Sequence, residues 1–122
     1  LIWHDNKIGI DIERIDRDFN YMELGKKYFY NSNRSNNKRE QYKNSVLNQW
    51  CAIEAAIKWD RGKIAKDIME WEYSENNKTL FHKKKKLNLK FTQINFYKWT
   101  ISYAYKGSYH FLPNIICSSK LV

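Results

Sequence analysis

Hydrophobic and polar positions divide the 122-residue chain into an N-terminal strand, a helical middle and a strand-rich C-terminal part. Segment 7–12 alternates as a strand does, and with residues 1–3 it is predicted to form a short hairpin. Apolar residues then recur at helical spacing in 20–30 and, over a longer stretch, in 38–61. Gly62 suits the end of the longer helix, because glycine commonly follows a helix C-terminus.

Beyond this helix and one further helical turn at 64–67, the periodicity changes to that of strands. The predicted strands are 69–73, 79–81, 87–91, 99–105 and 109–117, the last of which Pro113 breaks or confines to an edge. A polar loop at 31–37 separates the two helices. This order predicts an α+β fold, with an antiparallel sheet packed against one long helix in β-α-α-β-β order. The length fits a single domain over 1–122.

Each predicted helix has an apolar side that is expected to face the core. In the longer helix this side consists of Tyr42, Val46, Trp50, Ile53 and Ile57, and in the shorter one of Met22, Leu24, Tyr28 and Phe29. We expect Trp50 to anchor the long helix against the sheet, without a catalytic role.

Two stretches carry grouped charges. Alternation along the first strand places Asp11 and Glu13 on one face and the neighbouring isoleucines on the other. Glu54 and Lys58 lie one turn apart on the long helix, and taken alone they are most simply a surface ion pair worth a few tenths of a kcal/mol. Brought together, Asp11, Glu13 and Glu54 would form a set of oxygen ligands for a hard cation.

The two stretches together resemble the motifs of the 4'-phosphopantetheinyl transferase superfamily. Its motifs are Gly-hydrophobic-Asp-hydrophobic-Glu on a strand and Trp-x-x-Lys-Glu-Ala-x-x-Lys on a long helix. Residues 9–13, Gly-Ile-Asp-Ile-Glu, match the first motif completely. Residues 50–58 match the second, except that Ile53 stands where the family usually has lysine. Residues 27–29, Lys-Tyr-Phe, resemble the basic-aromatic-Phe element that precedes the helix in this family.

The resemblance implies an enzyme that transfers the 4'-phosphopantetheine arm of coenzyme A to a serine of an apo acyl or peptidyl carrier protein. It implies Mg²⁺ held by Asp11, Glu13 and Glu54, with the metal binding the diphosphate of coenzyme A. Lys58 is expected to contact the coenzyme's phosphates or to steady the acids, so Glu54 and Lys58 are the expected catalytic residues. Ile53 cannot supply a lysine's charge, and loop 31–37 has no glutamate where larger relatives carry a proposed base.

The superfamily contains a short, trimeric type and a surfactin type built from two similar halves. The acid spaced i+2 from Asp11 and the opening Trp50 of the helix motif resemble the two-half type. The chain is therefore expected to be a C-terminal half, whose partner would be its own N-terminal half. That missing half would supply much of the binding of adenine and of the 3'-phosphate.

Charge adds a second interpretation. Lys and Arg number 22 against 13 Asp and Glu, for a net charge of +9, which favours polyanionic partners such as an acidic carrier protein. A non-enzymatic basic module would instead bind nucleic acid or another polyanion through the lysine run 83–86 and the aromatic residues near it. That interpretation leaves the three acids without a purpose, because carboxylates oppose phosphate binding, so nucleic acid is the less favoured partner.

The cysteines and the hydropathy pattern indicate where in the cell the protein is expected. Cys51 and Cys117 show neither metal-ligand spacing nor a disulfide framework, which favours a reducing, cytoplasmic setting. No apolar run approaches membrane-spanning length, so no membrane partner is expected.

Overall fold

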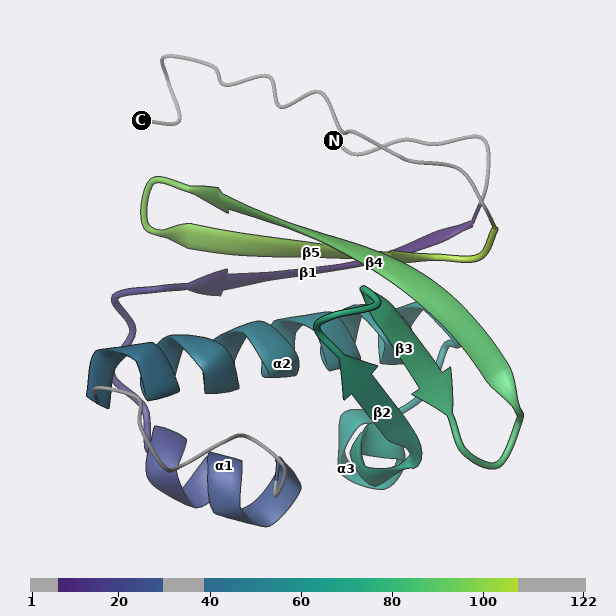
Figure 1. Cartoon of the computed structure of the whole chain (residues 1–122), viewed down its shortest axis with the longest axis horizontal. Helices are drawn as coiled ribbons and strands as arrows, with labels where there is room; N and C mark the ends of the chain where they lie inside the picture. The colour runs from purple at the N-terminus through teal and green to yellow at the C-terminus, as the bar shows by residue number, and fades with distance from the viewer. Residues whose placement is uncertain (1–6, 30–38, 108–122) are drawn as a thin grey trace.

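The computed structural model describes residues 7–29 and 39–107. The elements in chain order are β1 (Ile8–Arg14), α1 (Tyr21–Tyr28), α2 (Arg39–Trp59), α3 (Ile64–Asp67), the 3₁₀ turn η1 (Ile68–Glu70), β2 (Trp71–Ser74), β3 (Thr79–His82), β4 (Leu87–Phe96) and β5 (Trp99–Tyr105). In Figure 1, α2 lies between the strands β1, β4 and β5 on one side and the short helices α1 and α3 on the other. The predicted α+β class is therefore confirmed.

The five strands form one sheet in the order β1-β5-β4-β3-β2, and every neighbouring pair is antiparallel. Strands β2 to β5 follow one another as hairpins, whereas β1 joins the sheet by pairing with β5, the last described strand. In this register Asp11 lies opposite Ser102 and Glu13 opposite Thr100. The first segment of the fold is thus fixed by a segment about ninety residues later in the chain.

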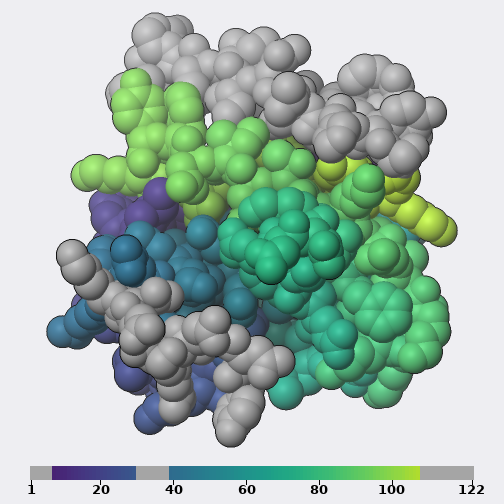
Figure 2. All heavy atoms as spheres, viewed as in Figure 1, coloured from purple at the N-terminus to yellow at the C-terminus, as the bar shows by residue number. Residues whose placement is uncertain are grey.

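Helix α2 is the centre of the core, because it is covered from more than one direction. Residues 51–57 are all buried, whereas an amphipathic helix on a flat sheet would bury only one stripe. The helix contacts β1 and β5 along one side, and α1, β2 and η1 along others. In Figure 2 the light-green strand segments lie above the blue residues of α2, and the teal segments lie beside them. None of the helices in 7–29 and 39–107 is long and apolar enough to cross a membrane.

Most predicted elements have the expected type, with ends that differ by a few residues. The helical turn 64–67 and the strand 99–105 are confirmed as predicted. The strand predicted at 87–91 continues to Phe96, because its second half pairs with β5 across a tight hairpin. The strand predicted from residue 69 begins at Trp71, after the 3₁₀ turn. The predictions for 1–3, 31–37 and 109–117 lie outside the described residues.

One side-chain prediction is wrong. Met22 was expected inside, but it is 47% exposed because α1 turns its other side, with Leu24 and Phe29, toward the core. Trp50 is partly buried against the core and contacts Tyr28 of α1, with ring centroids 6.2 Å apart, so its anchoring of α2 to the sheet stays a prediction. Cys51 is one of the small α2 side chains that contact the sheet, through the backbone oxygens of Asp11 on β1 and Thr100 on β5.

Candidate metal centre

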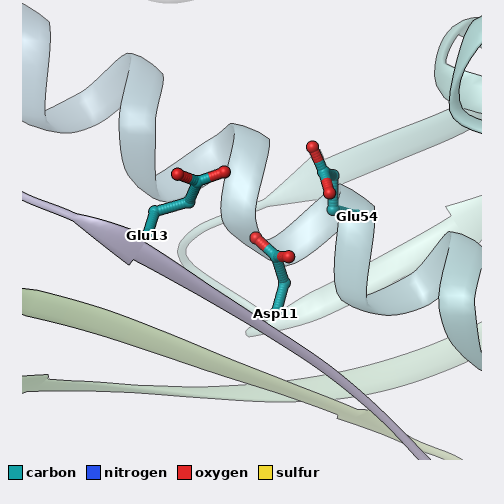
Figure 3. A group of neighbouring side chains, drawn as sticks. All are labelled: Asp11, Glu13 and Glu54. Atoms are coloured by element: carbon teal, nitrogen blue, oxygen red, sulfur yellow. The ribbon is translucent and has the colours of Figure 1, made fainter. Parts of the chain in front are cut away.

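Strand β1 and helix α2 bring three carboxylates together. Asp11, Glu13 and Glu54 each offer one oxygen, and these three oxygens lie within 4.8 Å of one another. Figure 3 shows Asp11 and Glu13 rising from the same face of β1 toward α2, with Glu54 on the helix beside them. Strand alternation explains the shared direction of the two strand acids. The three residues that the sequence suggested as metal ligands are thus gathered in one place.

The acid cluster, defined as Asp11, Glu13 and Glu54, is largely removed from solvent. Asp11 is 4% exposed and Glu54 7%, and the side chain of Glu13 is 13% exposed. Burial, with a smaller contribution from the neighbouring charge of Asp11, raises the pKa of Glu54 to about 7 against the opposing effect of Lys58. Buried carboxylates are costly unless a cation compensates them, so the cluster favours the binding of positive charge.

Two basic side chains already contact the cluster. The Nζ atom of Lys58 lies 2.6 Å from Oδ1 of Asp11 and 4.0 Å from Oε2 of Glu54. Arg17 donates a hydrogen bond of 2.8 Å to Glu13. Burial alone would lower the pKa of Lys58, but its hydrogen bond to Asp11 and the charges of Asp11 and Glu54 outweigh burial and raise it. The helical pair of Lys58 with Glu54 therefore exists, but Asp11 is the closer partner.

The hydrogen bonding of Asp11 indicates whether the cluster suits a metal ion. Its Oδ2 atom is buried, and no donor among the described residues forms a hydrogen bond with it. Leaving a buried acceptor without a partner costs about 1–3 kcal/mol, so such atoms usually have an additional partner. Carboxylate oxygens are the ligands that Mg²⁺ prefers, and above pH 7, where Glu54 is ionised, three carboxylates against two basic groups leave one negative charge uncompensated. The donor set therefore fits a hard divalent cation.

Cys51 ties the two elements of the site together, a role that the sequence did not suggest. Its Sγ atom lies 3.4 Å from the backbone oxygen of Asp11 and 3.8 Å from that of Thr100, and donates toward both. Burial raises the pKa of this thiol far above its ordinary range, so it stays protonated and is not a metal ligand. Its position three residues before Glu54 is the signal that places it on the same side of α2.

A cavity of about 380 Å³ is connected to the acid cluster through one residue, Arg17. Its lining residues are Arg17, Phe19, Asn20, Glu23, Leu24, Lys27, Tyr28, Leu47 and Trp50. Arg17 both lines this cavity and binds Glu13, whereas none of the three acids is among the lining residues. Arg17 was not predicted as a site residue, although its i+4 spacing from Glu13 was visible in the sequence. Two members of the basic-aromatic element, Lys27 and Tyr28, line the cavity as well.

Ile53, which stands at the lysine position of the helix motif, belongs to a different part of the molecule. It is 2% exposed and lines a second cavity, of about 400 Å³. The described residues around this cavity include Trp71 and Lys83 but none of the three acids. Ile53 therefore lines a cavity to which the three acids do not contribute.

The lysine run 83–86 forms the turn between β3 and β4 and is fully on the surface. Lys84 forms an ion pair with Glu70 at 2.8 Å, and Lys85 pairs with Asp60. His82, before the run, is buried and accepts a hydrogen bond from the backbone of Lys85. Phe91, one of the aromatics considered for stacking nucleic acid bases, is 2% exposed and packs on Tyr73 inside the protein, so it cannot stack bases.

Comparisons of the chain with protein-family models, with curated proteins and with solved structures found no match. The function of the acid cluster is therefore inferred from its own residues.

Proposed function

We propose that the chain is a 4'-phosphopantetheinyl transferase of the surfactin type, in its C-terminal half, and that it modifies an apo carrier protein in a Mg²⁺-dependent reaction. One observation carries the proposal: the two separated motif segments meet, and their carboxylates at positions 11, 13 and 54 converge to within 4.8 Å. Two motifs that resembled the family by chance would have no reason to place their acids in one buried cluster. The free oxygen of Asp11 supports the same conclusion.

Asp11, Glu13 and Glu54 would hold the metal ion. When bound, Mg²⁺ would offset the negative charge of the coenzyme A diphosphate and of the leaving 3',5'-adenosine bisphosphate. Lys58 has a half-exposed side chain at the rim of the cluster, which suits contact with a phosphate group. In the transfer, the carrier's serine oxygen forms a bond to the β-phosphorus of coenzyme A, and the bond from this phosphorus to the adenosine bisphosphate breaks.

The cavity beside the cluster is the proposed place for part of the substrate. Arg17 and Lys27 contribute positive charge to its wall, and Phe19, Tyr28 and Trp50 contribute apolar surface. A phosphopantetheine arm matches both features of this wall, because it has a charged phosphate end and a mostly uncharged chain. The net charge of +9 would in addition accelerate the encounter with an acidic carrier protein, more weakly at high salt.

The test is mass spectrometry of an apo carrier protein after incubation with the chain, coenzyme A and Mg²⁺. The expected result is a mass gain of one phosphopantetheine that disappears with EDTA and in Glu54→Gln. Glu40→Gln is the matched control, because Glu40 is an exposed glutamate in the first turn of the same helix. Metal-dependent binding of coenzyme A is measured in parallel, since the expected N-terminal half would contribute to transfer. A folded chain that neither transfers nor binds coenzyme A would overturn the proposal.

A basic module that binds nucleic acid or another polyanion is the second candidate. The exposed turn 83–86 favours it, because four successive lysines lie at the surface. Two of these lysines are held in ion pairs with acids of the same chain, which lowers the charge available to phosphates. Salt-dependent binding of a single-stranded oligonucleotide that Lys83→Gln and Lys86→Gln together abolish would favour this function over the transferase.

A further inference from the structure

We propose that Lys58 is the resident cation of the acid cluster, that Mg²⁺ displaces it from Asp11, and that the released ammonium group then binds a phosphate of the diphosphate substrate. This inference rests on the proposed function and adds to it the order in which the metal ion and the substrate bind. The metal ion would bind first, and the diphosphate afterwards. Lys58 would thus hold the cluster before the metal arrives and contact the substrate once it has left Asp11.

The first argument is competition for one carboxylate. The ammonium group of Lys58 lies 2.6 Å from Oδ1 of Asp11 and also reaches to within 4.0 Å of Glu54. These are two of the three residues that would hold the metal ion. A divalent cation on the same carboxylates would face the ammonium group across a few ångströms in a largely buried site, where like charges repel strongly. The ion pair and the metal ion therefore exclude each other.

The second argument is the difference in freedom between the partners. The side chain of Lys58 is 49% exposed, whereas that of Asp11 is 5% exposed and that of Glu54 10%. The carboxylates are fixed by the packing of β1 against α2, but the long stem of Lys58 can turn its charged end toward water. Displacement therefore requires only the rotation of one flexible side chain, and the fold does not change.

The third argument is the second oxygen of Asp11. Lys58 occupies Oδ1, while the buried Oδ2 receives no hydrogen bond from any described residue. The lysine thus compensates only part of the cluster, and a better-matched cation has an oxygen to bind. Arg17 holds Glu13 in a separate contact on the side of the cavity, so it does not replace Lys58 at Asp11.

The first experiment compares the Mg²⁺ affinity of the wild-type chain, Lys58→Met and Lys66→Met by isothermal titration calorimetry. Methionine keeps most of the stem of Lys58 and removes its charge. Lys66 is an exposed lysine on α3, so its variant loses the same charge from outside the cluster. We expect Mg²⁺ to bind about ten-fold more tightly to Lys58→Met and equally well to Lys66→Met. Equal or weaker binding to Lys58→Met would overturn the displacement of Lys58.

A second measurement uses the wild-type chain and does not depend on the folding of a variant. An amine-acetylating reagent is added with and without Mg²⁺, and the modification of each lysine is read by peptide mass spectrometry. We expect Mg²⁺ to increase the acetylation of Lys58 several-fold and to leave that of Lys66 unchanged. Protection of Lys58 by Mg²⁺, or no change, would count against its release.

A third measurement probes the contact with the substrate, with inorganic pyrophosphate as the ligand. At saturating Mg²⁺, pyrophosphate should bind about ten-fold more weakly to Lys58→Met than to the wild-type chain. Tighter metal binding together with weaker pyrophosphate binding is a split that a merely structural lysine would not produce. If both chains bind Mg²⁺ equally well, the displacement is wrong and the transferase proposal stands. If neither binds Mg²⁺, both proposals are wrong.

Discussion

Gly9 of β1 lies so close to Ala55 of α2 that a Cβ atom on residue 9 would be 2.0 Å from the backbone oxygen of Ala55. The same atom would also be 2.6 Å from the backbone nitrogen of Trp59. Backbone atoms of a helix cannot turn aside as a flexible side chain can. Asp11 and Glu54 stand on these two elements, so the contact at Gly9 sets the distance between the carboxylates of the cluster.

Gly9→Ala is therefore expected to separate β1 from α2. We expect a loss of about 3 kcal/mol or more in the free energy of unfolding, measured by urea denaturation, together with weaker Mg²⁺ binding. Gly62→Ala is the control, because the nearest atom to its Cβ would belong to the side chain of Asp67. Equal stability of the two variants would show that β1 and α2 can move apart at little cost.

Glu54→Gln should separate two properties of the acid cluster: the destabilisation that its crowded charges cause and the stabilisation that Mg²⁺ binding is proposed to give. Above pH 7 the substitution removes one of three crowded negative charges and keeps the shape of the side chain. We expect the metal-free variant to be more stable than the wild-type chain by about 1–2 kcal/mol, and to lose the stabilisation by Mg²⁺. Thermal unfolding at pH 8, with Mg²⁺ and with EDTA, measures both effects. A less stable metal-free variant would mean that Glu54 is held chiefly as the partner of Lys58.

The raised pKa of Glu54 also predicts how stability depends on pH without metal. The folded chain keeps the proton of Glu54 up to about pH 7, whereas the unfolded chain releases it near the ordinary value of 4.5. The native state therefore binds more protons between these values, and its stability falls as the pH rises through this window. The fall is at most roughly 3 kcal/mol, by the usual conversion of a pKa difference into free energy.

Urea denaturation between pH 4.5 and 8 measures this fall. Glu54→Gln should remove the contribution of Glu54 to this pH dependence, because glutamine does not ionise. Saturating Mg²⁺ should reverse it, since the metal binds the ionised carboxylate and binds it better as the pH rises. Stability that rises with pH in the metal-free wild-type chain, and does so only when Glu54 is present, would contradict a raised pKa.

Ile53→Lys, which restores the usual residue of the helix motif, is expected to harm this protein. Ile53 is 2% exposed and belongs to the hydrophobic core, so a lysine there must bury its stem in a closely packed place or its charge in an apolar one. We expect a loss of roughly 2–4 kcal/mol in urea denaturation, against less than about 1.5 kcal/mol for Ile53→Met. A stable Ile53→Lys variant with faster phosphopantetheine transfer would show that the second cavity takes part in catalysis.

The sequence predicted the elements well, because their patterns are local. The alternation around Asp11 and the helical spacing around Glu54 each indicate the type of their own segment, and the shared face of Asp11 and Glu13 follows from the strand alone. The far end of β4 was missed because residues 92–96 mix polar and apolar side chains, and they become a strand only by pairing with β5. Met22 was misplaced because a short helix at the surface has few contacts that fix its rotation.

The contacts across the site could not be predicted from the sequence. That Lys58 prefers Asp11 to its helical neighbour Glu54 depends on how closely β1 approaches α2. The anchoring of Cys51 to the backbones of β1 and β5 depends on the order of strands in the sheet. These facts come from contacts between residues forty or more positions apart, and no local pattern encodes them.

The pairing of β1 with β5 has a consequence for how the protein is made. As the chain leaves the ribosome, β1 emerges before α2, but the strand that pairs with β1 ends only at Tyr105. Until then β1 has an unpaired edge, with its two acids not yet fixed against the helix. The cluster can therefore form only late in synthesis, and a stalled or shortened product that lacks β5 would lack the strand that holds Asp11 and Glu13 against α2.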